Sequence, residues 1–392
     1  MARRIPVAER RARLARRHRL VDEARADSAA EVAGSLVGLH GTDPASVYLA
    51  AAARMRSATI DAIAAELYKA RSLVRMLAMR RTMWVFPIEL AAIAQAAATD
   101  AVARNERRKL EKMLVDGGVA AEAGAWLELA ESDTLRALAS RGEATGAELS
   151  ADVPQLREQF RFGMGTKWAG VQTATTRLLL LLAAEAKIVR ARPRGSWISS
   201  QYRWTPLESW LPGGFAEWEL EAAQTELVRR WLYAFGPATV EDVKWWTGWT
   251  LGATRRALAA AEAVEVDLDG AAGLVLPDDV EPVEAGEPWA ALLPALDPTA
   301  MGWLGRSWYL GEHAPALFDR SGNVGPTVWW NGRIVGGWGQ RPGGEVVYRL
   351  LEDVGAEAVA AIDNAVDRLS AFVEGTRLTP RFRTPLEREL SA

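Results

Sequence analysis

The chain has 392 residues, of which 49% are hydrophobic and 25% are charged, so it is long enough for two to four compact globular modules. It contains no cysteine, which excludes disulfides, thiolate metal sites and cysteine nucleophiles and favours a reducing compartment. The three histidines, His18, His40 and His313, are scattered along the sequence, so we expect neither a zinc site nor a cofactor.

The N-terminus lacks the features of an exported or membrane protein. Residues 1–20 are basic but contain neither the apolar stretch nor the cleavage site of a secretory signal. The longest apolar run, Leu178 to Ala184, is too short to cross a bilayer, and no heptad seam for dimerisation is present. We therefore expect a cytoplasmic monomer without a membrane partner, associated with the nucleoid when it is bound to DNA.

The charge is distributed unevenly, although the net charge is only −3. Residues 1–209 carry 32 Lys and Arg against 23 Asp and Glu, a net +9, and the remainder of the chain carries a net −12. A basic N-terminal half is typical of a protein that binds phosphates. A solvated, arginine-rich helix at residues 3–25 would produce much of the same imbalance.

Three segments show, with decreasing clarity toward the N-terminus, the order helix, helix, helix and strand hairpin. In residues 9–90, a basic helix precedes helical stretches at 31–41, 44–55 and 59–70 and a strand at 81–87. In residues 132–210, short helices at 132–142 and 145–153 precede a longer helix at 167–186 and a basic hairpin at 187–204. This is the order of a winged helix.

The clearest of the three segments covers residues 224–280. A helix is predicted up to Gly236-Pro237, and Thr239 with Asp242 resembles the capping box of the next helix, which Gly248 ends. A further helix precedes two alternating strands around Asp269-Gly270, a two-residue hairpin signal.

From Trp289 onward the chain is rich in short strands, with a second hairpin signal at Asn331-Gly332 and a final helix at about 357–374 that leaves a frayed, charged tail. We predict an α+β fold with three tandem winged-helix motifs and a β-rich C-terminal domain. The expected domains are residues 1–130, 131–215, 216–285 and 286–392.

Two basic segments have suitable chemistry for contacts with DNA phosphates. Arg255 and Arg256 lie on the third helix of the last unit. The basic residues of the middle hairpin occupy nearly alternate positions along the chain and are Lys187, Arg190, Arg192 and Arg194. Winged helices also serve as protein-binding or structural modules. The seventeen tryptophans suit base stacking, but most are expected to fill the core.

The segment from Leu36 to Ala50 is the most informative for chemistry. Asp43 before Pro44 predicts an N-cap with proline at the first helical position, so His40 and Thr42 precede the positive end of a helix. That location favours a neutral His40 and orients a bound water or anion. The alternative is that Thr42 supports the cap and His40 fills a turn.

Five segments resemble, in order and spacing, the winged-helix DNA glycosylases of the AlkZ/YcaQ type. They are HGTDPASVYLAAAARM, LVRMLAMRRTMWVF, RRWLYAFGPATVEDVKWWTG, LLPALDP and GPTVWWNGRIVGGW, and the resemblance covers nearly the whole chain. It implies three winged helices around a C-terminal β-barrel that form a concave channel for double-stranded DNA. It also implies hydrolysis of the glycosidic bond of N7-alkylguanine, including bulky genotoxin adducts or crosslinks, in antibiotic self-resistance or base excision repair.

The catalytic motif of that family, Gln-x-Gln or Gln-x-Asp, falls where this chain has His40-Gly41-Thr42. The resemblance therefore implies the position of the site, while neither His40 nor Thr42 is the residue that the family motif has there. N7 alkylation already makes guanine a cationic leaving group, so the remaining task is to position and deprotonate a water below C1′. Neutral His40 suits the role of base and the Thr42 hydroxyl suits orientation of that water.

Two further features follow from the resemblance. Asp297, in LLPALDP, is a candidate to face the lesion, or alternatively caps a turn beside Pro298. Arg333 and Trp338, around the hairpin at Asn331-Gly332, are candidates to approach the groove opposite the adduct, or belong to an ordinary barrel hairpin. The rival to a glycosylase is a non-catalytic winged-helix regulator or lesion-binding protein.

Overall fold

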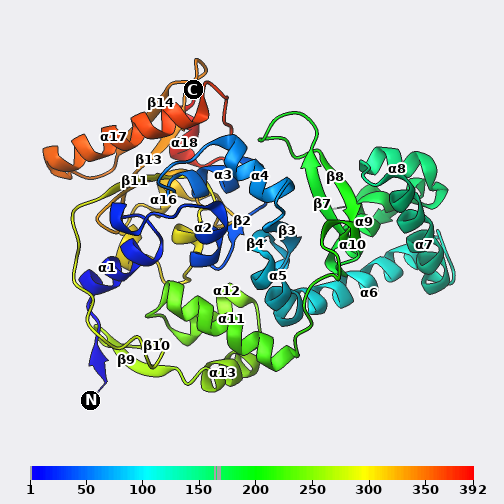
Figure 1. Ribbon diagram of the computed structural model, residues 1–392, viewed down its shortest axis with the longest axis horizontal. Helices are drawn as coiled ribbons and strands as arrows, with labels where there is room; N and C mark the ends of the chain where they lie inside the picture. Colours follow the sequence, from blue (N-terminus) through cyan, green and yellow to red (C-terminus); the bar gives the residue numbers. More distant parts are fainter. Residues whose placement is uncertain (1, 163–164, 166–168) are drawn as a thin grey trace.

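The structure is a computed structural model that describes residues 2–162, 165 and 169–392. It is a mixed α and β fold in which one lobe, containing α6 to α9, extends from a larger body (Figure 1). None of the helices in these described ranges is long and apolar enough to span a membrane.

The N-terminal part surrounds a small antiparallel sheet with the order β2-β4-β3. Three of its helices start at Ser28, Asp43 and Thr59, whose side chains accept hydrogen bonds from backbone N–H groups of the first turn. The elements are β1 (Arg3–Arg4), α1 (Val7–Arg17), α2 (Ala29–Ser35), β2 (Leu39–His40), α3 (Pro44–Ala52), α4 (Ile60–Tyr68), β3 (Leu73–Leu77) and β4 (Met83–Pro87).

The extended lobe has its own hydrophobic core, distinct from that of the body. The longer helix predicted at 167–186 begins only at Ala174, because Gly170–Thr173 pairs with Gln159–Phe162 in a hairpin; residues 167–168 lie outside the described residues. The elements of the lobe are α6 (Asp100–Asp116), α7 (Ala123–Arg141), α8 (Gly146–Asp152), β5 (Gln159–Phe162), β6 (Gly170–Thr173), α9 (Ala174–Ala184) and the hairpin of β7 (Ile188–Pro193) and β8 (Tyr202–Pro206). On either side of them in the chain, α5 (Ile88–Ala94) and α10 (Leu207–Trp210) pack on the core of the body.

The next segment confirms the predicted caps and turn. Thr239 and Asp242 form a capping box, and Asp269 and Gly270, both with positive φ, connect two antiparallel strands. β1 pairs in parallel with the first of these two strands, β9. The expected N-terminal helix therefore starts at Val7 rather than at residue 3. The elements are α11 (Leu220–Phe235), α12 (Val240–Thr247), α13 (Leu251–Ala260), β9 (Val264–Leu268) and β10 (Ala271–Val275).

The C-terminal part contains an open sheet with the order β11-β12-β13-β14, and α17 lies over it (Figure 1). The described residues therefore form no closed barrel, because β11 and β14 remain edges. Asn331-Gly332 forms the predicted turn. The elements are β11 (Ala290–Leu293), α14 (Pro298–Met301), α15 (Ser307–Leu310), α16 (Ala314–Leu317), β12 (Thr327–Trp330), β13 (Arg333–Gln340), β14 (Val346–Leu350), α17 (Gly355–Val373) and α18 (Pro385–Leu390).

The tail after α17 is packed, which contradicts the prediction of a frayed end. Leu378 and Leu386 are buried, and α18 lies against β13. The tail also reaches the N-terminal part of the chain, since the Arg381 N–H donates to Asp43, the N-cap of α3.

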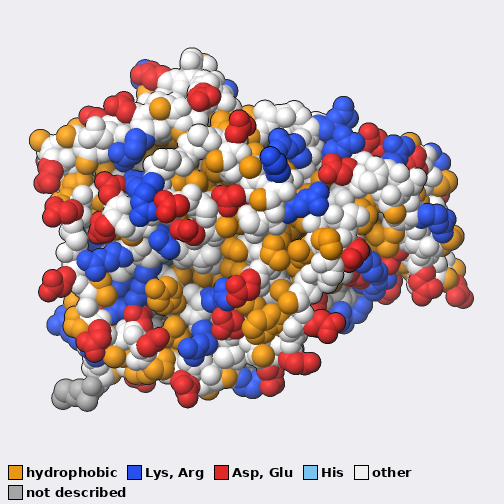
Figure 2. Space-filling view, in the orientation of Figure 1, with side chains coloured by type: hydrophobic (Ala, Val, Ile, Leu, Met, Phe, Trp, Pro, Cys, Tyr) orange, Lys and Arg blue, Asp and Glu red, His pale blue; other side chains and the backbone are white. Residues whose placement is uncertain are grey.

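Most of the tryptophans fill the core, as predicted. Among the described residues nine of the seventeen are buried: Trp84, Trp210, Trp231, Trp246, Trp289, Trp303, Trp308, Trp329 and Trp338. Several contact one another, as Trp84 does with Trp246, and thereby join β4 to α12. Figure 2 shows one face of the molecule, on which basic and acidic side chains are interspersed around a central group of hydrophobic ones.

Candidate active site

The turn between β2 and α3 carries His40, Gly41 and Thr42. His40 pairs with Trp84 of β4, and the Gly41 N–H donates to the Met83 carbonyl at 2.7 Å. A Cβ on Gly41 would lie 2.9 Å from Nη1 of Arg75 and 3.2 Å from the Trp84 backbone, so a larger residue would have to displace the Arg75 side chain and shift the strand slightly. The turn is therefore in contact with the backbone of β4 and with the side chain of Arg75.

The His40 imidazole is neutral over the physiological range. Burial, and then the positive charges of Arg80 and Arg75, lower the pKa of His40 to about 4. Its ring centroid lies 5.7 Å from that of Trp84, and Nδ1 is buried without a hydrogen-bond partner among the described residues. A buried imidazole nitrogen without a partner is rare enough to suggest that a ligand or water occupies the site.

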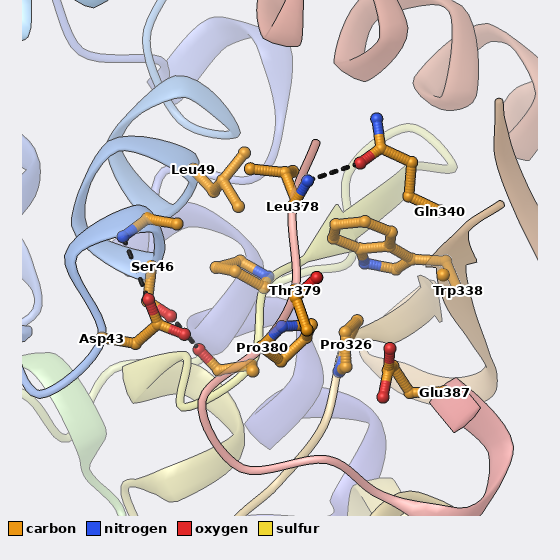
Figure 3. A pocket seen from close by; sticks show the side chains of 14 residues that line it. Asp43, Ser46, Leu49, Pro326, Trp338, Gln340, Leu378, Thr379, Pro380 and Glu387 are labelled. Carbon is orange, nitrogen blue, oxygen red and sulfur yellow. Dashed lines mark hydrogen bonds between the residues drawn. The ribbon is translucent and has the colours of Figure 1, made fainter. Parts of the chain in front are cut away.

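Thr42 is half-buried and Asp43 anchors the start of α3. Asp43 accepts hydrogen bonds from the N–H groups of Ala45 at 3.1 Å and Arg381 at 3.0 Å. Figure 3 shows the tail residues Leu378 to Pro380 between Asp43 and Gln340. The side-chain oxygen of Gln340 accepts a hydrogen bond from the Leu378 N–H at 2.6 Å. The tail thus fixes the carboxylate next to Thr42.

Arg75 of β3 stabilises the same turn through a hydrogen bond to its backbone. Its side chain is buried, its Nη1 donates to the Gly41 carbonyl, and its guanidinium carbon lies 4.9 Å from the ring centroid of Tyr202. Tyr202 belongs to the β7–β8 hairpin, so the extended lobe contributes to the site. Sequence reasoning missed Arg75, although a single charge inside the apolar strand Leu73–Leu77 was a usable signal.

These features belong to a chain that matches a known family. The sequence model of a family described as "DNA glycosylase AlkZ-like" matches residues 33–372. The chain belongs to the AlkZ-like DNA glycosylase family. The match spans the β2–α3 turn and the β7–β8 hairpin, and it identifies the chain as a DNA glycosylase rather than a regulator.

A solved structure supports the same fold. The DNA glycosylase AlkZ of Streptomyces sahachiroi is 22% identical, with a TM-score of 0.73, over 96% of this chain and 99% of that chain. No curated protein matches the chain. In this AlkZ-like glycosylase, the described residues contain no group of three or more side chains suited to hold a metal ion.

The four basic residues predicted along the middle hairpin do not share one exposed face. Lys187 precedes β7 and forms ion pairs of 2.8 Å with Glu131 and Glu185. Arg190 is half-buried, and burial followed by the charge of Arg75 lowers the pKa of Arg190 to about 10. Arg192 and Arg194 are exposed. A register shift between Arg190 and Pro193 interrupts the period of two on which the prediction relied.

The remaining predicted contacts have different surroundings. Arg255 and Arg256 are exposed on α13, and Arg333 is exposed but paired with Glu352. Trp338 is only 3% exposed and its indole N–H donates to the Leu293 carbonyl at 2.9 Å, so the prediction that it contacts DNA is wrong.

The lesion-facing role predicted for Asp297 is also wrong. The residue is fully buried, and its two carboxylate oxygens accept from Arg54 at 2.7 and 2.9 Å while one also caps α14. It therefore has the alternative role, a structural cap.

Proposed function

We propose that this glycosylase hydrolyses the N-glycosidic bond of N7-alkylguanine in double-stranded DNA, with His40 as the base and Thr42 as the residue that orients the water. The observation that carries the proposal is the neutral, half-buried His40 with a buried, partnerless Nδ1, at the turn that the family resemblance marks as catalytic. Bulky genotoxin adducts are the preferred lesions in this proposal, and antibiotic self-resistance or base excision repair is the corresponding role.

The chemistry needs no metal because the leaving group is activated in the substrate. As the bond from C1′ to N9 breaks, its electron pair neutralises the positive charge of the alkylated base. The water oxygen bonds to C1′ and gives its proton to His40. A base with a pKa of about 4 is weak, so proton transfer follows bond cleavage, as suits an oxocarbenium-like transition state.

The test is base release from a duplex with one N7-methylguanine, detected as an abasic site under single-turnover conditions. His40→Ala should lower the rate by about 10²–10⁴ while DNA affinity is unchanged, because the base assists only the chemical step. Thr42→Val retains the side-chain shape without the hydroxyl and should lower the rate more than the affinity.

His313→Ala is the matched control, because His313 contacts Glu352 in the C-terminal part and should leave excision unchanged. If both site variants excise as fast as the parent, the assigned residues are wrong. If the parent releases no base from either methyl or bulky N7 adducts, the substrate class is wrong.

A further inference from the structure

Two arginines from distant parts of the chain contact the ring of Tyr202, and a third lies close enough for its charge to act on one of them. The guanidinium carbons of Arg75 (β3) and Arg190 (β7) lie 4.9 and 5.3 Å from the ring centroid of Tyr202. The positive charge of Arg381, from the tail, acts on Arg190, and its backbone is fixed by Asp43. We refer to Arg75, Arg190 and Arg381 as the guanidinium cluster.

The cluster lacks the close ion pairs that other buried arginines of this protein form. Arg13 and Arg54 have no exposed side-chain surface, and both form close ion pairs, with Glu9 and Asp279 and with Asp297, respectively. Arg75 is only 4% exposed, yet within the described residues neither it nor Arg190 forms an ion pair. The charge of the buried Asp43 carboxylate acts on Arg75 and Arg381, but one carboxylate does not offset three guanidinium groups. The remaining positive charge favours a bound anion, since buried charges are costly unless they are paired.

Several donors of this group are also unsatisfied. Nε and Nη2 of Arg75 and the hydroxyl of Tyr202 are buried and have no hydrogen-bond partner among the described residues. A planar guanidinium fork and a hydroxyl together match the oxygens of a phosphate. Arg381 and the neighbouring Arg192 are exposed, so the cluster is reached from solvent at its rim.

We propose that the guanidinium cluster and Tyr202 bind one backbone phosphate of the DNA, beside the nucleotide that enters the site at His40. Arg75 also donates to the Gly41 carbonyl, so the bound phosphate and the turn share one side chain. Arg75 is thus a positioning residue that sets the distance between the DNA backbone and the water on His40. The binding of a DNA phosphate by the cluster rests on the proposed function in one respect, namely that the nucleotide next to this phosphate is the one that enters the site at His40.

The experiment measures the affinity for a duplex with a tetrahydrofuran abasic analogue, in which one phosphate at a time is replaced by an uncharged methylphosphonate. The parent should lose about tenfold at one or two linkages next to the analogue. Arg190→Gln should bind more weakly, show a salt slope lower by roughly 0.9, and be insensitive to replacement of those same phosphates.

Arg136→Gln is the matched control, because this exposed arginine pairs with Asp133 on α7 and should keep the profile of the parent. If Arg190→Gln retains the profile of the parent, the cluster does not hold a phosphate. The duplex has no base to excise, so an enzyme inactive on N7-alkylguanine still gives a clear answer.

A second readout separates anion binding from a structural role. Inorganic phosphate should raise the thermal unfolding temperature of the free parent more than that of Arg190→Gln, because only the parent keeps the complete site. The variant also loses the contacts of Arg190 with the rings of Tyr202 and Trp204, so the comparison is between the shifts that phosphate causes in each protein. An equal phosphate effect on both proteins would contradict the proposal.

Discussion

The acid limb of the pH–rate profile is the most direct measure of His40. An unperturbed histidine has a pKa of about 6.5 and would be neutral in about 3% of molecules at pH 5. Because burial and the charges of Arg80 and Arg75 lower the pKa of His40 to about 4, about 90% of the molecules keep a neutral imidazole at that pH. The base is active when deprotonated, so excision should be about thirtyfold faster at pH 5 than an unperturbed histidine would allow.

The assay is single-turnover release of N7-methylguanine between pH 4.5 and 8, corrected for spontaneous base loss, with circular dichroism to confirm that the protein stays folded. The rate should be level from pH 8 to about 5.5 and fall only toward pH 4. Thr42→Val should reduce the rate at every pH without moving the midpoint. A midpoint near 6.5 would show that the catalytic imidazole is solvated and would refute this assignment.

Three further variants test the structure itself. Asp297→Asn should lower the free energy of unfolding in urea by about 3–5 kcal/mol, because the buried Arg54 loses its counter-ion; an unchanged value would contradict a structural role. Lys187→Gln should leave the salt dependence of DNA binding unchanged, whereas exposed Arg194→Gln should lower the log–log slope by roughly 0.9; the opposite order would place the DNA differently. Asp242→Ala should lower the thermal unfolding temperature, at a cost of about 1–3 kcal/mol, since it removes the carboxylate half of the capping box of α12 and the acceptor for the N–H groups of Leu304 and Gly305; a neutral effect would be inconsistent with those contacts.

Several features were readable from the sequence because their causes are local. The capping box of Thr239 and Asp242 forms between residues three apart, and the turns at Asp269-Gly270 and Asn331-Gly332 depend on the backbone freedom of two residues. The prediction of a helix at 167–186 failed because the partner strand Gln159–Phe162, which holds Gly170–Thr173 in extended form, gave no clear signal of its own.

For the site, the sequence by itself determined that His40 and Thr42 precede a capped helix, since Asp43 and Pro44 follow directly in the chain. It did not determine the protonation state of His40 or which distant residues surround the site. The neutral imidazole depends on burial and on Arg75 and Arg80, which arrive on other elements. Only the tertiary structure decided that Asp43 meets Arg381, 338 positions away, because contacts between distant residues depend on how the elements pack and not on any local pattern.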